Sequence, residues 1–241
     1  MKPIHAAYTQ EVYANLRPLH ATWEPTQPLK IGDIGVLQGR AFRQQTHLDA
    51  LLIEFSERRG GARPNLWFGS HGTTEIELKP EVVAAAGVLP QRASLELSFN
   101  SEGAVFFHAA QCESVFISDK KTLGRAVIDR FKRSDWDQKW VVVTEVVKAA
   151  ATTIVISGQS DATLKLEAQA TVPSLDLAES NLRFQVRSVA RVDYQLISSN
   201  GLTPLIGLSK LQRSWFHQPE FGPSLAESEE SDTAWRFVEI A

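Results

Sequence analysis

Residues 141–172 read VVVTEVVKAAATTIVISGQSDATLKLEAQATV, and this stretch decides the fold. Residues 139–157 form a long run rich in Val, Thr and Ile, the β-branched residues that favour strands. Residues 158–161 supply a turn, and residues 164–172 then carry an apolar side chain at every second position. We therefore expect two strands, the first of them unusually long.

The flanking sequence adds further strands. Residues 93–99 alternate as ASLELSF, 100–103 (NSEG) have turn chemistry, and 104–109 form a β-rich run, which predicts a hairpin. Downstream, 182–186 and 192–196 alternate on either side of an irregular patch at 188–191, where we expect a bulge or a twist. We expect 139–157, 164–172 and these downstream segments to form neighbouring antiparallel strands, and two short strands to surround Gly39 within 31–42.

Five helices are expected between these strands. Their boundaries rest on prolines and N-caps at the start and on glycines at the end. The expected ranges are 9–16, 50–59 after an N-cap at Asp49, 80–87, 119–135 after a cap at Ser118 or Asp119, and 204–216.

The composition is that of a folded protein, with 43% hydrophobic residues and a net charge of −3. The fold class predicted is α+β, a twisted, mainly antiparallel sheet with helices packed on its faces. Residues 1–216 are expected to form one body, followed by 217–241 as a linker and a docking segment. The single cysteine, Cys112, excludes an internal disulfide, and no apolar run has the length of a secretion signal or a membrane helix. We expect a cytoplasmic protein without a nucleic-acid partner, because no excess of Lys and Arg neutralises phosphates.

The helix expected at 119–135 is the most basic element. Its apolar residues share one face, which leaves the cations to meet solvent or acidic lipid headgroups. Trp136 and Trp140 follow it as candidate interfacial aromatics; the alternative is a solvated helix with both tryptophans packed beneath. The candidate lipid contacts are Lys120, Lys121, Arg125, Arg130, Lys132 and Arg133.

The C-terminal tail changes character twice. Residues 224–232 (SLAESEESD) form an acidic linker, with Ser224, Leu225, Glu227 and Asp232 marking the stretch where a protease would cut. The last residues, AWRFVEI, are apolar again at Trp235, Phe237, Val238 and Ile240. This segment is either a final edge strand of the sheet or a detachable clasp over a surface needed later.

Catalytic motifs are absent from the sequence, so no cofactor is expected and an enzyme is disfavoured. His108 and Cys112 on one strand face would stand about 13 Å apart and not touch. The loop 69–75, with His71, is a polar loop or a small ligand site, and the six histidines lack metal-ligand spacing. Glu145, the one charge in VVVTEVV, is interpreted as lying on a solvated strand face or, alternatively, as a functional carboxylate.

Residues 93–216, about half of the chain, resemble the pore-forming domain of bacterial gasdermins. The most specific fragment is VVVTEVV at 141–147, preceded by the helix and loop 120–135 and followed by the alternating segments 164–172 and 182–186. Unlike bacterial members, this chain has no cysteine within residues 1–30.

The resemblance implies an autoinhibited protein of cell death and antiphage defence. An activating protease would remove the C-terminal segment. The body would then bind acidic lipid on the inner face of the cell membrane, self-associate there and permeabilise the membrane. The hairpins expected at 93–109 and 141–172 are long enough to span a bilayer as tilted strands, which take about 9–11 residues each.

The main alternative is a soluble cytoplasmic binding module, in which the same sheet holds a protein partner or a small apolar ligand. An enzyme with a dispersed site is the third possibility. The tail discriminates between the first two, because a clasp releases activity from a body that stays folded.

Overall fold

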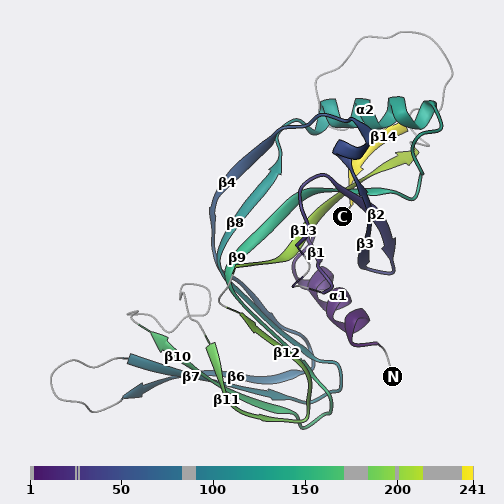
Figure 1. The fold of residues 1–241 in the computed structure, drawn as a ribbon. Helices are drawn as coiled ribbons and strands as arrows, with labels where there is room; N and C mark the ends of the chain where they lie inside the picture. Colours follow the sequence, from purple (N-terminus) through teal and green to yellow (C-terminus); the bar gives the residue numbers. More distant parts are fainter. Residues whose placement is uncertain are drawn as a thin grey trace, which may run out of the picture.

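The computed structural model describes residues 3–24, 26, 28–82, 91–170, 184–198, 201–213 and 235–240. Within these ranges the chain forms a ten-stranded sheet, here called the main sheet, and a separate four-stranded sheet (Figure 1). All pairings are antiparallel, so the predicted α+β class with a mainly antiparallel sheet is confirmed.

The main sheet is built around β9 (Val141–Ser157), the long strand expected from the Val, Thr and Ile run. On one side β9 pairs with β8 (Val105–Ile117) and, near its start, with β2 (Asp33–Gln38). On its other side lie β12 (Val192–Ser198) and β13 (Leu202–Arg213).

Shorter strands complete the main sheet. They are β3 (Ala41–His47) beside β2, β4 (Glu57–Arg63) and β5 (Leu66–Gly69) along β8, and β1 (His20–Ala21) and β14 (Trp235–Glu239) along β13.

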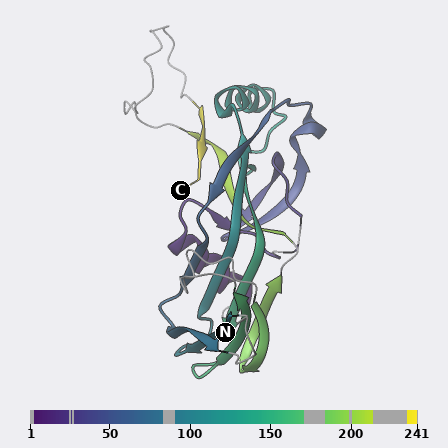
Figure 2. The same ribbon diagram turned by 90° about the vertical axis from the view of Figure 1, so that its left-hand side faces the viewer.

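The four-stranded sheet has the order β11-β10-β7-β6, with β6 at Thr73–Val82, β7 at Gln91–Phe99, β10 at Thr163–Ala170 and β11 at Phe184–Ala190. It lies at the end of the main sheet opposite α2 (Lys120–Lys132) (Figures 1 and 2). The two hairpins expected from the sequence are wrong in their pairing. β7 pairs with β6 and β10 rather than with β8, and β9 does not pair with β10. At the expected turns, residues 100–103 and 158–161, the chain does not fold back on itself; it passes from one sheet into the other.

The irregular patch at 188–191 is a second change of sheet. β11 ends at Ala190 in the four-stranded sheet, and β12 begins at Val192 in the main sheet. Arg191 joins them with a φ of 57°, a left-handed conformation that turns the chain between the two strands. The predicted antiparallel pairing of 182–186 with 164–172 holds where both are described, as β11 with β10.

Three predicted helices are wrong. Residues 50–59 form the end of a short 3₁₀ helix, η1 (Leu48–Leu51), and the beginning of β4, because pairing with β8 outweighs the helical pattern. Pro80 lies in β6, at the sheet edge where a missing N–H is tolerated, and 83–90 lie outside the described residues. Residues 204–213 belong to β13, which pairs with β9 and packs Leu205, Ile206 and Leu208 fully buried in the cores; 214–216 lie outside the described residues.

Two predicted helices are confirmed. The first, α1 (Ile4–Asn15), begins earlier than expected and buries Tyr8 and Val12 against the main sheet. The second is α2, capped by Asp119, whose carboxylate accepts a hydrogen bond of 2.9 Å from the backbone N–H of Thr122. The strands around Gly39 are confirmed as β2 and β3.

Gly35 in β2 allows β3 to approach closely at a register shift. A Cβ added at Gly35 would overlap the backbone carbonyl oxygen of Arg43, which cannot move without breaking the β2–β3 ladder. Gly61 in β4 has no atom within 4 Å of such a Cβ and is the matched control.

We expect Gly35→Ala to lower the free energy of unfolding by about 2–4 kcal/mol, the range of overpacked buried sites. Gly61→Ala should change it by less than about 0.5 kcal/mol. Urea unfolding of the two variants checks this. Equal midpoints for both would show that the β2–β3 approach is not tight.

Candidate functional site

Some of the cations of the basic helix α2 contact the protein itself, and others are exposed to solvent. Leu123 and Val127 are buried in the core of the main sheet, and the opposite face carries the cations. Arg130 points back to the protein, where it donates a 2.5 Å hydrogen bond to the carbonyl oxygen of Leu51 and lies 3.8 Å from the Asp135 carboxylate. Lys120 is half-buried. The predicted cations that remain exposed are Lys121, Arg125, Lys132 and Arg133.

The tryptophans after α2 do not form an exposed aromatic belt. Trp136 is buried in the same core as Leu123, and Trp140 packs edge-on against it with ring centroids 5.2 Å apart. The indole N–H of Trp140 donates to the side-chain oxygen of Gln45. Their expected role as interfacial aromatics is therefore wrong, because both rings pack beneath the helix as the alternative interpretation held.

The C-terminal residues form β14, which pairs with β13 along Ser209 to Arg213 and lies against α2 (Figure 1). The N–H of Ile240 donates 2.8 Å to the carbonyl oxygen of Leu208, and the Ile240 side chain packs on the core beneath α2. The predicted segment residues Trp235, Phe237 and Val238 belong to this strand. The candidate cleavage positions Ser224, Leu225, Glu227 and Asp232 lie outside the described residues.

A buried histidine lies near the end of this strand. His20 in β1 is 1% exposed, and neither ring nitrogen has a hydrogen-bond partner. Its ring packs 5.0 Å from the ring of Tyr13. Burial and the positive charge of Arg40 lower the pKa of His20 from 6.5 to about 4, and the backbone of Ile240 opposes part of this lowering.

The second notable place is the bend between the two sheets, defined here as residues 100–103 and 158–161. On both sides of it the same two stretches of chain are paired, β8 with β9 in the main sheet and β7 with β10 in the four-stranded sheet. Ser157 is fully buried at this bend. Its hydroxyl accepts from the backbone N–H of Ala104 (2.9 Å) and donates to the carbonyl oxygen of Ser101 (2.6 Å).

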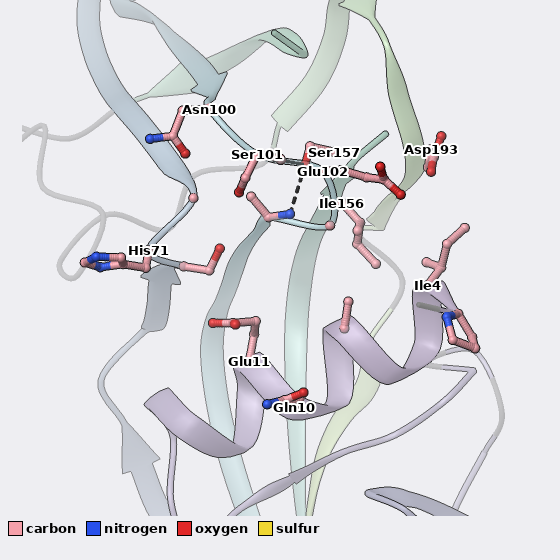
Figure 3. Close-up of a pocket in the computed structure, with 16 residues that line it drawn as sticks. Ile4, Gln10, Glu11, His71, Asn100, Ser101, Glu102, Ile156, Ser157 and Asp193 are labelled. Atoms are coloured by element: carbon pink, nitrogen blue, oxygen red, sulfur yellow. Dashed lines mark hydrogen bonds between the residues drawn. The ribbon is translucent and has the colours of Figure 1, made fainter. Parts of the chain in front are cut away.

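A cavity of about 970 Å³ opens between the bend and α1 (Figure 3). Ile4, Ala7 and Ile156 give it an apolar part, and Glu11, Glu102 and Asp193 bring carboxylates from three separate elements. The loop expected as a polar loop or a small ligand site contributes Ser70, His71 and Gly72 to the same wall. The volume of this cavity is in the range of pockets that bind drug-sized ligands.

The other residues singled out in the sequence have packing roles. Gln111, with a φ of 52°, changes the alternation of β8. Cys112 consequently packs with Phe107 and Ala109, whereas His108 packs against Phe184 from the other face. The expected shared face for His108 and Cys112 is wrong. Burial raises the pKa of the Cys112 thiol, which disfavours the reactive thiolate.

Glu145 is not solvated, contrary to the prediction. Its side chain is 13% exposed, and its carboxylate lies 2.5 Å from the Arg63 guanidinium and 3.0 Å from the Ser114 hydroxyl. Gly207 on β13 leaves the space that the Glu145 side chain needs. This ion pair connects β4 to β9 across β8 and explains the one charge in VVVTEVV.

Sequence reasoning missed Ser157, the inward role of Arg130 and the buried state of His20. A serine at the end of an apolar run carries a weak signal for a chain bend, and no pattern links residue 130 to residue 51. These roles arise from contacts between segments far apart in the sequence.

No family model matches the chain, and the search of curated proteins finds no match either. Neither helix in the described part of the chain has the length and apolar character needed to cross a membrane. The described residues also contain no group of three or more His, Cys, Asp and Glu side chains arranged to hold a metal ion.

His20 should make the protein sensitive to acid. Its pKa is lower in the folded than in the unfolded state, so its contribution to stability is complete above pH 6.5 and is lost as the pH falls toward 4. Between pH 7.5 and 4.5 this loss amounts to about 2–3 kcal/mol, at about 1.4 kcal/mol per pKa unit. Urea unfolding at pH 7.5 and 4.5 should show His20→Phe losing less stability than wild type by this amount. The control His71→Phe, at an exposed histidine, should behave like wild type.

Proposed function

We propose that the protein is an autoinhibited pore former. Proteolytic release of its C-terminal segment allows the body to self-associate on acidic lipid and to insert strands of the four-stranded sheet into the inner face of the cell membrane. The protein is cytoplasmic before release. No catalytic step is assigned to it.

One observation carries this proposal: β7–β8 and β9–β10 form a single ribbon in one register. The residue numbers of paired partners have the same sum on both sides of the bend, as with Ser98 and Thr163 or Val105 and Ile156. The unpaired stretches between them, 100–103 and 158–161, are equal in length. Straightening the bend therefore extends the ladder without any strand slipping, so the cost of a register shift is absent.

The ribbon also has the side-chain pattern of a membrane strand. Every second residue is apolar and buried from Ala93 to Phe99 and again from Val105 to Ala109, although the two runs pack in different cores of the folded protein. In a straightened ribbon, period 2 would place both runs on one face with only Ser101 and Gly103 between them. The other face is polar through Glu102, which gives an amphipathic stretch of roughly the length that a tilted membrane strand requires. The alternating polar residues on this face are Ser94, Glu96, Ser98, Asn100 and Glu102.

β14 is the restraint that keeps the uncut protein inactive in this proposal. It covers the edge of β13 and brings Ile240 into the core beneath α2. Removing it would leave backbone N–H and C=O groups of β13 unpaired, and such an edge pairs readily with another chain. Cutting between Ser224 and β14 thus links proteolysis to self-association.

The first experiment truncates the chain after Ser224 and measures dye release from liposomes containing acidic lipid. We expect leakage from the truncated chain and none from the full-length protein. Circular dichroism of the truncated chain is the control for folding. A folded truncated chain that causes no leakage would rule out the proposal.

A second test uses the hydrogen-bond alternation in β14. Because the N–H of Ile240 points to β13, the N–H of Val238 does so too, and the N–H of Glu239 points away. Val238→Pro removes a ladder hydrogen bond and should make the uncut protein leaky. The neighbouring control Glu239→Pro keeps the ladder and should stay inactive. Equal leakage from both variants would show that strand pairing is not the restraint.

The cavity beside the bend favours a second candidate, a soluble module that binds a small ligand with apolar and polar parts. It is tested by screening small molecules for a rise in melting temperature. A ligand whose effect disappears in Ala7→Trp, a variant that fills the cavity from α1, would support this candidate. Leakage from the truncated chain would favour the pore former.

A further inference from the structure

Leu52 is the most exposed large hydrophobic side chain in the described part of the protein. It is 84% exposed, whereas the next, Val189, is 48% exposed. Leu52 also has a φ of 54°, in the left-handed region that L-residues other than Asn and Asp seldom adopt. Leu52 therefore lowers the stability of the folded state in two ways: its backbone conformation is strained, and its apolar side chain is exposed to water.

The surrounding contacts fix Leu52 in this position. The N–H of Leu52 donates 3.0 Å to the carbonyl oxygen of Asp49, which closes the end of η1. Leu48 and Ile53 on either side are buried in the core. Arg130 of α2 donates to the carbonyl oxygen of the preceding residue, Leu51. The turn therefore presents Leu52 outward beside α2, and η1 lies next to α2 in both views (Figures 1 and 2).

The neighbouring charges favour an anionic partner. Residues 119–133 contain six Lys and Arg against Asp119 and Asp129, a net charge of +4. Asp119 is already used as the helix cap. Asp49 and Glu54 near Leu52 are exposed carboxylates that reduce this charge locally, but four cations of α2 remain exposed. An apolar side chain beside exposed cations is the arrangement that binds a membrane interface.

We propose that Leu52 is an apolar anchor that, with the exposed cations of α2, docks the full-length protein on an anionic lipid surface. These groups are exposed while β14 is in place, so docking does not require release of the C-terminal segment. This inference rests on the lipid contact of α2 in the proposed function. It adds that the uncut protein already binds the membrane surface.

The substitution Leu52→Gly separates anchoring from folding. Glycine adopts the left-handed conformation without strain, so the melting temperature should rise by about 2–4 °C. Partition of the uncut protein onto vesicles of phosphatidylserine and phosphatidylcholine should nevertheless fall about tenfold, because an anchoring leucine contributes at least this much. The matched control Val189→Ser, at an exposed hydrophobic residue of the four-stranded sheet, should bind as wild type does.

Lys132→Gln combined with Arg133→Gln should weaken binding further, by about fivefold per charge at low salt. Vesicles of phosphatidylcholine alone should bind little of the wild-type protein. Failure of the uncut wild-type protein to bind acidic vesicles, or unchanged binding by a folded Leu52→Gly variant, would overturn the inference.

A fluorescent label gives an independent readout. Cys112 is buried, so Leu52→Cys offers the one accessible thiol among the described residues for an environment-sensitive dye. The control is Gln111→Cys, another exposed residue with left-handed backbone, about 20 Å along β8 from the end that leads into α2. Acidic vesicles should shift the emission of the label at 52 and not at 111; equal responses would contradict anchoring by Leu52.

These outcomes are distinct from those of the pore test. Vesicle binding by the uncut protein without leakage from the truncated chain would sustain the anchor and reject the pore. Leakage from the truncated chain without binding of the uncut protein would do the reverse.

Discussion

The backbone ladder between β8 and β9 is the constraint on which the other elements depend. β9 pairs with β8 and β2 on one side and with β12 and β13 on the other, and packing against the hydrophobic clusters buries both of its faces along most of its length. Every other strand of the main sheet is reached through β8, β2 or β13. Burial of both faces leaves almost no position for a polar side chain, which explains why the sequence of β9 is almost continuously β-branched or small.

The ladder continues past the main sheet, and the same two stretches of chain become the inner strands of the four-stranded sheet. Ser157 holds the two parts at an angle by bonding across the bend, and β14 closes the edge of β13 at the far end. The Ser157 bonds and the β13–β14 pairing are each a small set of hydrogen bonds, and the β7–β8 and β9–β10 ribbon keeps one register on both sides of the bend. Because the register is the same on both sides of the bend, straightening the ribbon would require no strand to slip, and the proposed function uses such an extended arrangement.

Some of the strands were predictable, because alternation and β-branching are local properties. β9, β10 and the β2–β3 pair follow from period 2 and from turn residues. The helices predicted at 50–59 and 204–216 are wrong, because an amphipathic helix and a buried strand share apolar residues, and pairing with β8 and β9 decides between them. In the candidate site, the cations of α2 were predictable from composition, whereas the inward position of Arg130 and the exposed turn at Leu52 depend on contact between residues 51 and 130.

The sequence by itself determined a mainly antiparallel α+β protein, a capped basic helix and an apolar segment at the C-terminus, because each depends on neighbouring residues. The tertiary structure alone decided which strands pair, where the ribbon bends, which cations stay exposed and which edge β14 covers. These features depend on hydrogen bonds and packing between residues far apart in the chain. Period 2 assigns a side chain to a face of a strand but carries no information about the neighbouring strand, so the pairing of β7 with β10 and of β13 with β14 could not be derived from it.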